Sequence, residues 1–255
     1  MKMQSEDKVS IVVPTYNVER LIGFTIDSVI NQSYKNWELL LVDDCSSDNT
    51  KELLQKYAQK DNRIKCHFSS ENLGAGGARN VGLSIATGRF IAFLDSDDLW
   101  SPNKLERQIS FMKLNNAPIS HTSFSFIDEN GQERRGKVDV SSQVGLLDNL
   151  KRTEIATSTA VIDRCLVKDE FRFSLLRARQ DLKLWIYLLG MGYNSFGLDE
   201  NLVHYRVRKD SVSSNKWKML YLTFKVYMSI EQLPVSQRFY CYINYVFNAI
   251  KKRGE

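Results

Sequence analysis

The chain has 255 residues, of which 43% are apolar and 25% are charged. This length and apolar content, with 13 Phe, 11 Tyr and 4 Trp, exclude a mainly disordered chain and are enough for one large domain. The formal net charge of +5 is unevenly spread, because residues 201–255 hold ten Lys and Arg against three Asp and Glu.

The first half of the chain predicts strands and helices in alternation. Runs of apolar and β-branched residues predict four buried strands, at 9–14, 37–42, 63–68 and 90–94. Helical spacing predicts helices between them, over 18–32 with Asn17 as a cap, from Ser46 onwards, and over 76–86. This alternation is typical of βαβ units. We therefore expect an α/β fold with a mostly parallel sheet and helices on both faces.

The second half of the chain is less regular. Residues 119–128 alternate between apolar and polar, and the Asn130-Gly131 pair that follows indicates a hairpin. Residues 157–162 predict a strand, and 181–190 predict a short helix. The chain has no internal repeat and no obvious linker, so we expect one domain followed by a C-terminal appendage.

Acidic residues directly follow the predicted strand at 90–94. Asp95-Ser96-Asp97-Asp98 places three carboxylates within four residues, and these repel one another unless a cation or solvent compensates them. Oxygen ligands without a nearby His or Cys favour Mg²⁺ or Mn²⁺ over zinc, and such ions are commonly shared with substrate phosphates. A solvated turn that caps the following helix at Pro102 is an equally good interpretation of this stretch alone.

A second acidic pair, Asp43-Asp44, follows the strand at 37–42. A carboxylate there can accept a hydrogen bond from a base or a ribose, or can cap a helix together with Ser46. Ligands of parallel sheets bind beyond the carboxyl ends of the strands. We therefore expect one shared crevice, containing Tyr16, Asp43, Asp44, Asp95 and Asp97.

Glycine-rich residues 74–80 (GAGGARN) only partly match a dinucleotide-binding loop. Arg79 stands where the third glycine would be, and the stretch follows the third predicted strand rather than the first. It offers a helix N-terminus and a guanidinium, which both suit phosphate. A tight loop with a surface arginine is the alternative.

Four motifs together resemble the family 2 inverting glycosyltransferases, which have the GT-A (Rossmann-like) fold. They are VSIVVPTYN at 9–17, WELLLVDDCSSD at 37–48, NLGAGGARNVG at 72–82 and GRFIAFLDSDD at 88–98. The resemblance covers residues 9–115 at nearly every landmark. It implies that 1–115 is the nucleotide-sugar-binding half of a GT-A domain, that 116–213 is the acceptor-binding half, and that 214–255 is a basic, aromatic helical region.

The resemblance also implies a donor site. Pro14, Thr15 and Tyr16 would line the nucleoside pocket, Asp44 with Asp43 would bind the base or ribose, and Arg79 would lie near the ribose or diphosphate. Asp95 and Asp97 match the D-x-D motif, which binds the ribose and a divalent metal, Mn²⁺ or Mg²⁺. Ser96 lies between them in the nucleotide-sugar site, and Asp98 is an alternative metal ligand.

The acceptor half resembles the family less closely. Arg179-Gln180-Asp181 stands where family members commonly carry Glu-Asp, so Asp181 is the expected catalytic base, and it could also cap the helix at 181–190. His204-Tyr205-Arg206, with Ser211 and Ser213, resembles the family's Y-R…S stretch, which can close over the diphosphate. Arg206 is therefore expected at the donor site.

The resemblance implies which reaction takes place. Processive members carry a Q-x-x-R-W motif and membrane helices, whereas none of the four tryptophans here follows an arginine. We expect a non-processive, metal-dependent transfer of a hexose from UDP-glucose or UDP-galactose. Relatives of this size suggest GlcNAc-diphosphoundecaprenol as the acceptor and a β-linkage in O-antigen or cell-surface polysaccharide as the product.

The C-terminal region suggests contact with a membrane. Six apolar side chains would share one face of a helix over 217–230, and an aromatic run at 239–250 precedes Lys251-Lys252-Arg253; the six are Trp217, Leu220, Tyr221, Phe224, Tyr227 and Met228. Such a helix could lie in the membrane interface or pack on the domain. The chain has no run of about 18 apolar residues and no apolar signal segment. We expect a cytoplasmic protein peripherally bound to the inner membrane.

Other functions are possible on the sequence alone. The chain could be a catalytically silent module that binds nucleotide-sugar, or a glycosyltransferase that acts on a protein or capsule acceptor. A nicotinamide oxidoreductase is disfavoured by the interrupted glycine pattern. Nucleic-acid binding is not expected, because no recognition motif accompanies the basic residues.

Overall fold

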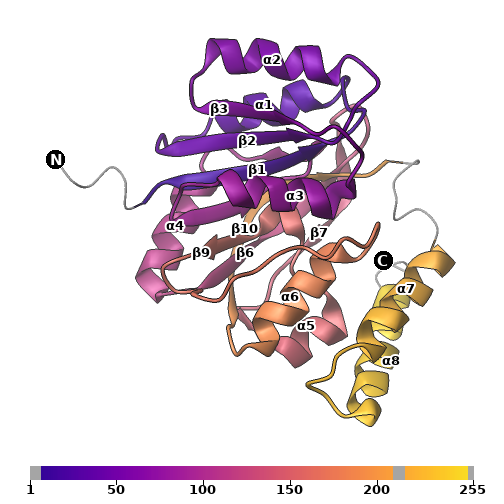
Figure 1. Cartoon of the computed structure of the whole chain (residues 1–255). Helices are drawn as coiled ribbons and strands as arrows, with labels where there is room; N and C mark the ends of the chain where they lie inside the picture. The colour runs from indigo at the N-terminus through magenta and orange to yellow at the C-terminus, as the bar shows by residue number, and fades with distance from the viewer. Residues whose placement is uncertain (1–6, 209–215, 252–255) are drawn as a thin grey trace.

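A computed structural model describes residues 7–208 and 216–251, and within them ten strands form one sheet (Figure 1). The strand order is β3-β2-β1-β4-β9-β6-β10-β5, with β7 paired to β6 and β8 to β10. The strands are β1 (Val9–Thr15), β2 (Trp37–Asp43), β3 (Ile64–Phe68), β4 (Phe90–Phe93), β5 (Leu99–Trp100), β6 (Ile119–Ile127), β7 (Glu133–Val138), β8 (Gln143–Val144), β9 (Val161–Asp163) and β10 (Ser195–Arg206). The helices are α1 (Ile22–Ile30), α2 (Thr50–Lys60), α3 (Gly74–Ile85), α4 (Lys104–Asn115), α5 (Leu146–Arg152), the 3-10 helix η1 (Thr157–Thr159), α6 (Gln180–Gly190), α7 (Lys216–Met228) and α8 (Val235–Lys251).

The parallel arrangement predicted from the sequence holds for the N-terminal strands. β1 pairs in parallel with both β2 and β4, and β2 pairs in parallel with β3. The second half of the sheet is mixed, because β9 runs antiparallel to both β4 and β6 while β6 and β10 are parallel. The predicted hairpin is confirmed: β6 and β7 are antiparallel, and Gly131 adopts a φ of +84° in the turn.

Helices cover both faces of the sheet, as expected, and each face has its own apolar core (Figure 1). Alternation along β1 explains the division, since Ile11 points into one core and Val12 into the other. Helices α1, α2 and α4 contribute to the first core, and α6 contributes Leu184, Trp185 and Leu188 to the second. The sheet is therefore fixed from both sides, and the carboxyl ends of its parallel strands are held in register.

Some predicted element boundaries were wrong. The first helix begins at Ile22 rather than at residue 18, and Asn17 does not cap it. Asn17 instead adopts a φ of +50°, which Asn tolerates, and its Oδ1 accepts a hydrogen bond from the Ser47 amide. The stretch at 157–162 is not one strand, because η1 interrupts it before β9 begins at Val161.

The C-terminal helices α7 and α8 pack on α5 and α6 through a third apolar cluster. The predicted apolar face of α7 is divided: Tyr227 is fully buried in this cluster, whereas Trp217 is 84% exposed and Tyr221 57% exposed. None of the helices in the described part of the chain combines the length and apolar content needed to cross a bilayer. One side of the α7–α8 tail therefore packs against α5 and α6, and the other side exposes aromatic rings to solvent.

Candidate functional site

The predicted acidic residues gather where β1, β2 and β4 end. Register pairs Thr15 at the end of β1 with Asp43 at the end of β2, and the Thr15 hydroxyl lies 3.3 Å from the Asp43 carboxylate. Asp43 also accepts hydrogen bonds from the amide and the hydroxyl of Ser46. This contact with Ser46 was one of the predicted alternatives, although it shapes the loop before α2 and does not cap the helix itself, which begins at Thr50.

Asp44 is bound to the glycine-rich segment. Its carboxylate accepts hydrogen bonds from the backbone amides of Leu73 and Gly74, at 2.7 and 2.8 Å, where α3 begins. Asp44 is 3% exposed, so it satisfies two amide groups that the helix leaves unpaired. Tyr16, in contrast, is 51% exposed just beyond β1.

Arg79 is a buried side chain rather than a surface arginine. It lies in α3, is 4% exposed, and donates to the Asp95 carboxylate at 2.5 Å, with the Phe173 ring centroid 5.1 Å from its guanidinium carbon. Its Nε and Nη1 atoms are buried without a hydrogen-bond partner in the described structure. Unpaired buried donors are costly, so the Arg79 guanidinium is suited to an anionic or hydroxylated ligand.

The turn after β4 is not the solvated helix cap that the sequence also allowed. Asp98 is 1% exposed and accepts hydrogen bonds from the Ser158 hydroxyl at 2.5 Å and the Arg206 amide at 2.9 Å. Helix α4 starts later, at Lys104. Burial, followed by the charges of Asp95 and Asp97, raises the pKa of Asp98 well above its usual value.

Asp97 faces solvent more than Asp98 does. Its Oδ2 lies 3.4 Å from Nη1 of Arg208, an arginine that the sequence analysis did not select. Burial and the neighbouring charge of Asp95 raise the pKa of Asp97. Within the described residues no three His, Cys, Asp or Glu side chains gather as a metal site. Asp95 and Asp97 offer the hard oxygen ligands that Mg²⁺ and Mn²⁺ prefer, and substrate oxygens would have to complete the coordination.

Helix η1 connects the acidic turn to Asp181. The Ser158 hydroxyl donates to Asp98 and accepts from the Asp95 amide, and the adjacent Thr157 hydroxyl donates to Asp181 at 3.4 Å. Asp181 lies in the first turn of α6, whose N-cap is Arg179. Sequence analysis missed Thr157 and Ser158 because it assigned them to a strand; the run of hydroxyl side chains at 157–159 was the available signal.

The pKa of Tyr205 is raised by four carboxylates from the acidic turn and from α6. Burial raises the pKa of the Tyr205 phenol first, and the charges of four carboxylates raise it further, those of Asp98, Asp95, Asp97 and Asp181. The charges of the predicted D-x-D motif and of the predicted base therefore both raise the pKa of this partly buried phenol, although they are more than 80 residues apart in the chain.

The other predicted residues of this region are held by the protein. Arg206 is 4% exposed and donates from Nε to the Asp97 carbonyl and from Nη1 to the carbonyls of Asp128 and Glu129. His204 lies within hydrogen-bond distance of Ser125 and Ser101 through its two ring nitrogens. Ser211 and Ser213 lie outside the described residues.

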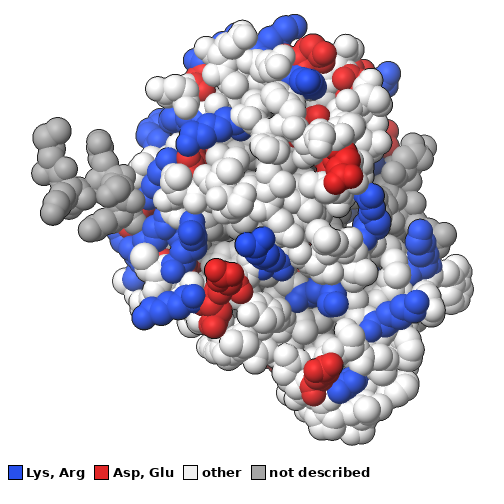
Figure 2. All heavy atoms as spheres, viewed as in Figure 1, with Lys and Arg blue, Asp and Glu red and all other residues white. Residues whose placement is uncertain are grey.

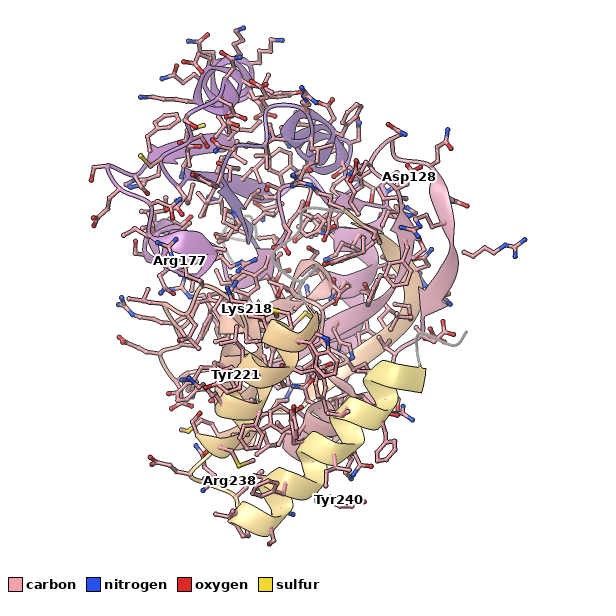
Figure 3. The ribbon with its side chains drawn as sticks, turned by 90° about the vertical axis from the view of Figure 1, so that its right-hand side faces the viewer. Asp128, Arg177, Lys218, Tyr221, Arg238 and Tyr240 are labelled. Carbon is pink, nitrogen blue, oxygen red and sulfur yellow. The ribbon has the colours of Figure 1, made fainter. Side chains whose placement is uncertain are left out.

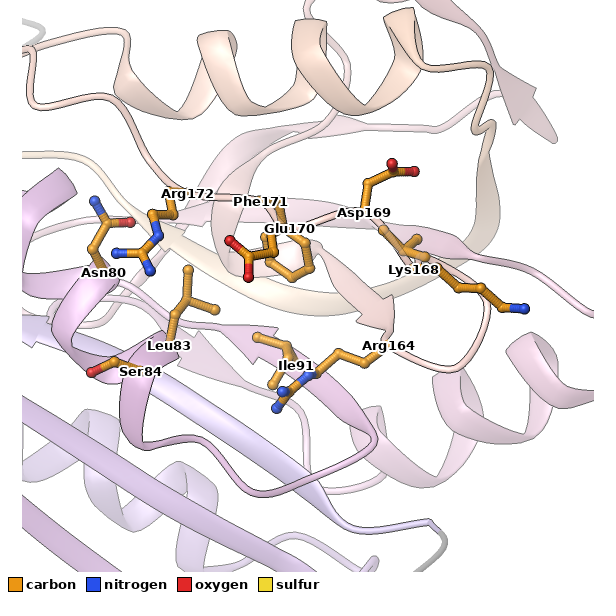
Figure 4. A pocket seen from close by; sticks show the side chains of 11 residues that line it. Asn80, Leu83, Ser84, Ile91, Arg164, Lys168, Asp169, Glu170, Phe171 and Arg172 are labelled. Carbon is orange, nitrogen blue, oxygen red and sulfur yellow. The ribbon is translucent and has the colours of Figure 1, made fainter.

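The described part of the structure has two notable cavities, and of the predicted site residues only Arg206 lines one of them. One of about 830 Å³ opens beside Arg206 and Arg208, and its walls come from the segment after β1 and from the β6–β7 turn. Its volume is in the range of small-molecule sites. The other, of about 390 Å³, lies between α3 and the segment at 164–172, and contains none of the predicted site residues (Figure 4).

Comparisons with known proteins agree with this geometry. The family model described as "Glycosyl transferase family 2" matches residues 10–169. TuaG of Bacillus subtilis (strain 168), named as a teichuronic acid biosynthesis glycosyltransferase, is 40% identical over 96% of this chain and 97% of its own. WfgD of Escherichia coli, named as a UDP-Glc:alpha-D-GlcNAc-diphosphoundecaprenol beta-1,3-glucosyltransferase, is 39% identical over 96% of this chain and 95% of its own.

A solved structure shares the fold. The mannosyltransferase PcManGT from Pyrobaculum calidifontis, in complex with GDP-Man and Mn²⁺, superposes with a TM-score of 0.72 over 95% of this chain and 70% of its own. The two sequences are 17% identical, so the likeness concerns the fold alone. The fold is the GT-A arrangement, with a central open sheet between helices.

Two carboxylates of this site should affect stability in opposite directions. Asp97→Asn should raise the thermal unfolding midpoint at pH 7 in EDTA, because the raised pKa of Asp97 means that the folded state disfavours its charge. Asp44→Asn should lower the free energy of unfolding by about 1 kcal/mol, because it removes one of the two oxygens that bind the α3 amides. Shifts of the same sign in both variants would contradict this assignment.

Proposed function

The chain belongs to glycosyl transferase family 2, and we propose that it transfers one hexose from UDP-glucose or UDP-galactose to GlcNAc-diphosphoundecaprenol. The product would carry a β-linkage and serve O-antigen or other cell-surface polysaccharide synthesis. The observation that carries this proposal is the link from the acidic turn through Ser158 and Thr157 to Asp181. The name of WfgD, 39% identical over nearly the whole chain, supports the choice of donor and acceptor.

The donor would bind along residues 1–115, with its nucleoside against the end of β1. Tyr16 offers an exposed ring for stacking on the base, next to Pro14 and Thr15. The unpaired nitrogens of Arg79 would contact the ribose or diphosphate. The remaining proposed donor contacts are Asp43, Asp44, Asp95, Ser96 and Arg206.

A divalent cation, Mn²⁺ or Mg²⁺, fits the carboxylates of Asp95 and Asp97 and would supply positive charge against the departing diphosphate. Mn²⁺ accompanies GDP-Man in the PcManGT complex, which supports this choice. Asp98 would hold the turn in place rather than bind the cation, because the Ser158 hydroxyl and the Arg206 amide already donate to its two oxygens. Arg208 lies beside Asp97 and would add a second positive charge near the diphosphate.

Asp181 would act as the catalytic base, within the acceptor half at 116–213. It would take the proton from the acceptor hydroxyl while that oxygen bonds to the anomeric carbon. The bond from this carbon to the diphosphate breaks, and its electron pair leaves with UDP. Attack from the face opposite to the leaving group inverts the configuration, so an α-linked donor yields a β-linked product.

The acceptor would reach the site from a membrane surface contacted by α7 and α8. The outer side of α8 carries apolar residues four positions apart, Val235, Phe239, Ile243 and Phe247, which are 45–68% exposed. Figure 3 shows α8 beside α7, where Lys218 and Tyr221 lie, and Figure 2 shows more Lys and Arg than Asp and Glu over these helices. Apolar and aromatic side chains flanked by cations are typical of interfacial helices. We propose that the protein binds the cytoplasmic face of the inner membrane.

A donor screen tests the reaction. Purified protein, Mn²⁺ and a GlcNAc-diphosphate-lipid analogue are incubated with UDP-glucose, UDP-galactose and other nucleotide sugars, with and without EDTA, and the products are analysed by mass spectrometry. We expect the mass of the acceptor to rise by a single hexose, and EDTA to prevent the reaction. Repeated additions would contradict the non-processive assignment.

Failure of transfer would be informative too. UDP binding without transfer would reject the lipid-linked acceptor and favour a silent binding module or a protein or capsule acceptor. Absence of both transfer and UDP binding would contradict the donor assignment.

A vesicle sedimentation assay tests the membrane contact. Ile243→Asp with Phe247→Asp should lower affinity for phosphatidylglycerol-containing vesicles by about tenfold or more, because it replaces two apolar side chains with charges. Leu114→Asp is the matched control, since Leu114 is 86% exposed on α4, away from α7 and α8. Equal binding by both variants would reject α8 as the membrane contact.

A further inference from the structure

The residue that caps α6 is held in an uncommon conformation. Arg179 has a φ of +64°, in the left-handed region that a non-glycine residue adopts only when its surroundings require it. It lies two residues before Asp181, and its carbonyl accepts the Lys183 amide at 3.1 Å, a hydrogen bond that closes the first turn of α6. The position of Asp181 therefore depends on the conformation of Arg179.

The side chain of Arg179 reaches the C-terminal region. Its Nη2 donates to the Tyr245 hydroxyl on α8 at 2.7 Å, and its guanidinium carbon lies 5.8 Å from the centroid of the Tyr245 ring. Tyr245 is 8% exposed. This contact joins the N-cap of the helix that carries Asp181 to a segment 66 residues later in the chain.

Helix α6 also packs between two apolar cores. Leu184 and Trp185 face the core on the sheet, whereas Leu182 and Ile186 face the cluster formed with α7 and α8. The tail is in turn fixed to α5 by the Tyr227 hydroxyl, which donates to the Leu150 carbonyl. The contact between Arg179 and Tyr245 thus joins two helices, α6 and α8, that are each packed in an apolar cluster.

We propose that Arg179 and Tyr245 are positioning residues, through which the C-terminal helices hold the first turn of α6 and thereby keep Asp181 directed at the acceptor hydroxyl. This inference rests on the proposed role of Asp181 as the base. The tail then has two functions on opposite sides of α8: an outer apolar surface and an inner tyrosine that acts on the site. A small displacement of a catalytic group is enough to slow a reaction considerably.

Tyr242 provides a matched control for Tyr245. Both tyrosines lie on α8 and belong to the same aromatic cluster, with ring centroids 6.2 Å apart. The Tyr242 hydroxyl donates to the Leu220 carbonyl, which lies within the tail, whereas the Tyr245 hydroxyl contacts Arg179. Replacement of either tyrosine by Phe removes one hydroxyl and keeps the ring.

The test compares kcat with the donor KM and the UDP Kd in these two variants. We expect Tyr245→Phe to lower kcat by about three- to tenfold, with the donor KM and UDP Kd unchanged, and Tyr242→Phe to leave all three unchanged. Arg179→Gln should lower kcat similarly, and combining it with Tyr245→Phe should add little, because the two side chains act through one contact. Arg179→Lys, which keeps a charged donor, should retain more activity than Arg179→Gln.

Amide hydrogen exchange of residues 180–184 gives a readout that does not require transfer. Exchange there should be faster in Tyr245→Phe than in Tyr242→Phe. Equal exchange in the two variants, or equal effects on kcat, would overturn the positioning role. Absence of transfer by the unaltered protein would instead overturn the proposed function, and the exchange experiment would still test whether Tyr245 holds this turn.

Discussion

The site depends on how the fold tolerates three carboxylates within four residues at the end of β4. Four groups from other parts of the chain compensate these carboxylates: Arg79 from α3, the Ser158 hydroxyl from η1, the Arg206 amide from β10, and Arg208 just after β10. The Thr25 hydroxyl of α1 also contacts the backbone of this turn, where it donates to the Ser96 and Asp98 carbonyls. Compensation of these charges therefore involves segments that lie between residues 25 and 208 of the chain.

The charges of the acidic turn are only partly compensated by protein groups. The groups that stay uncompensated indicate which kind of ligand the site suits. The pKa values of Asp97 and Asp98 stay raised, while two nitrogens of Arg79 stay unpaired. A donor diphosphate with its cation would satisfy both signs of charge at once. Under the proposed function, this arrangement, which is unfavourable without ligand, would be preorganised for the donor. The tail contributes differently, since α7 and α8 pack against α6, the helix that carries Asp181.

Much of the fold, and the grouping of acidic side chains at the strand ends, could be predicted from the sequence, because strand periodicity and short-range motifs are local. The parallel strands, the Asn130-Gly131 hairpin and the acidic strand ends follow from residues next to one another. What could not be predicted depends on distant contacts. The side chain of Arg179, whose backbone is left-handed, donates to Tyr245, and the η1 hydroxyls donate to carboxylates that lie more than 20 residues away on either side. Tyr227 became buried because α5 and α6 pack against one face of α7, which helical spacing alone does not reveal.

The most direct test of the account is the rate of a single turnover in Asp181→Asn, measured beside the affinity for UDP. Asp169→Asn, on the segment before α6, is the control. We expect Asp181→Asn to be slower by a factor of about 10²–10⁴ with UDP affinity unchanged, and Asp169→Asn to transfer normally. A rate for Asp181→Asn close to that of the unaltered protein would contradict the role of Asp181 as the base and the site built around it.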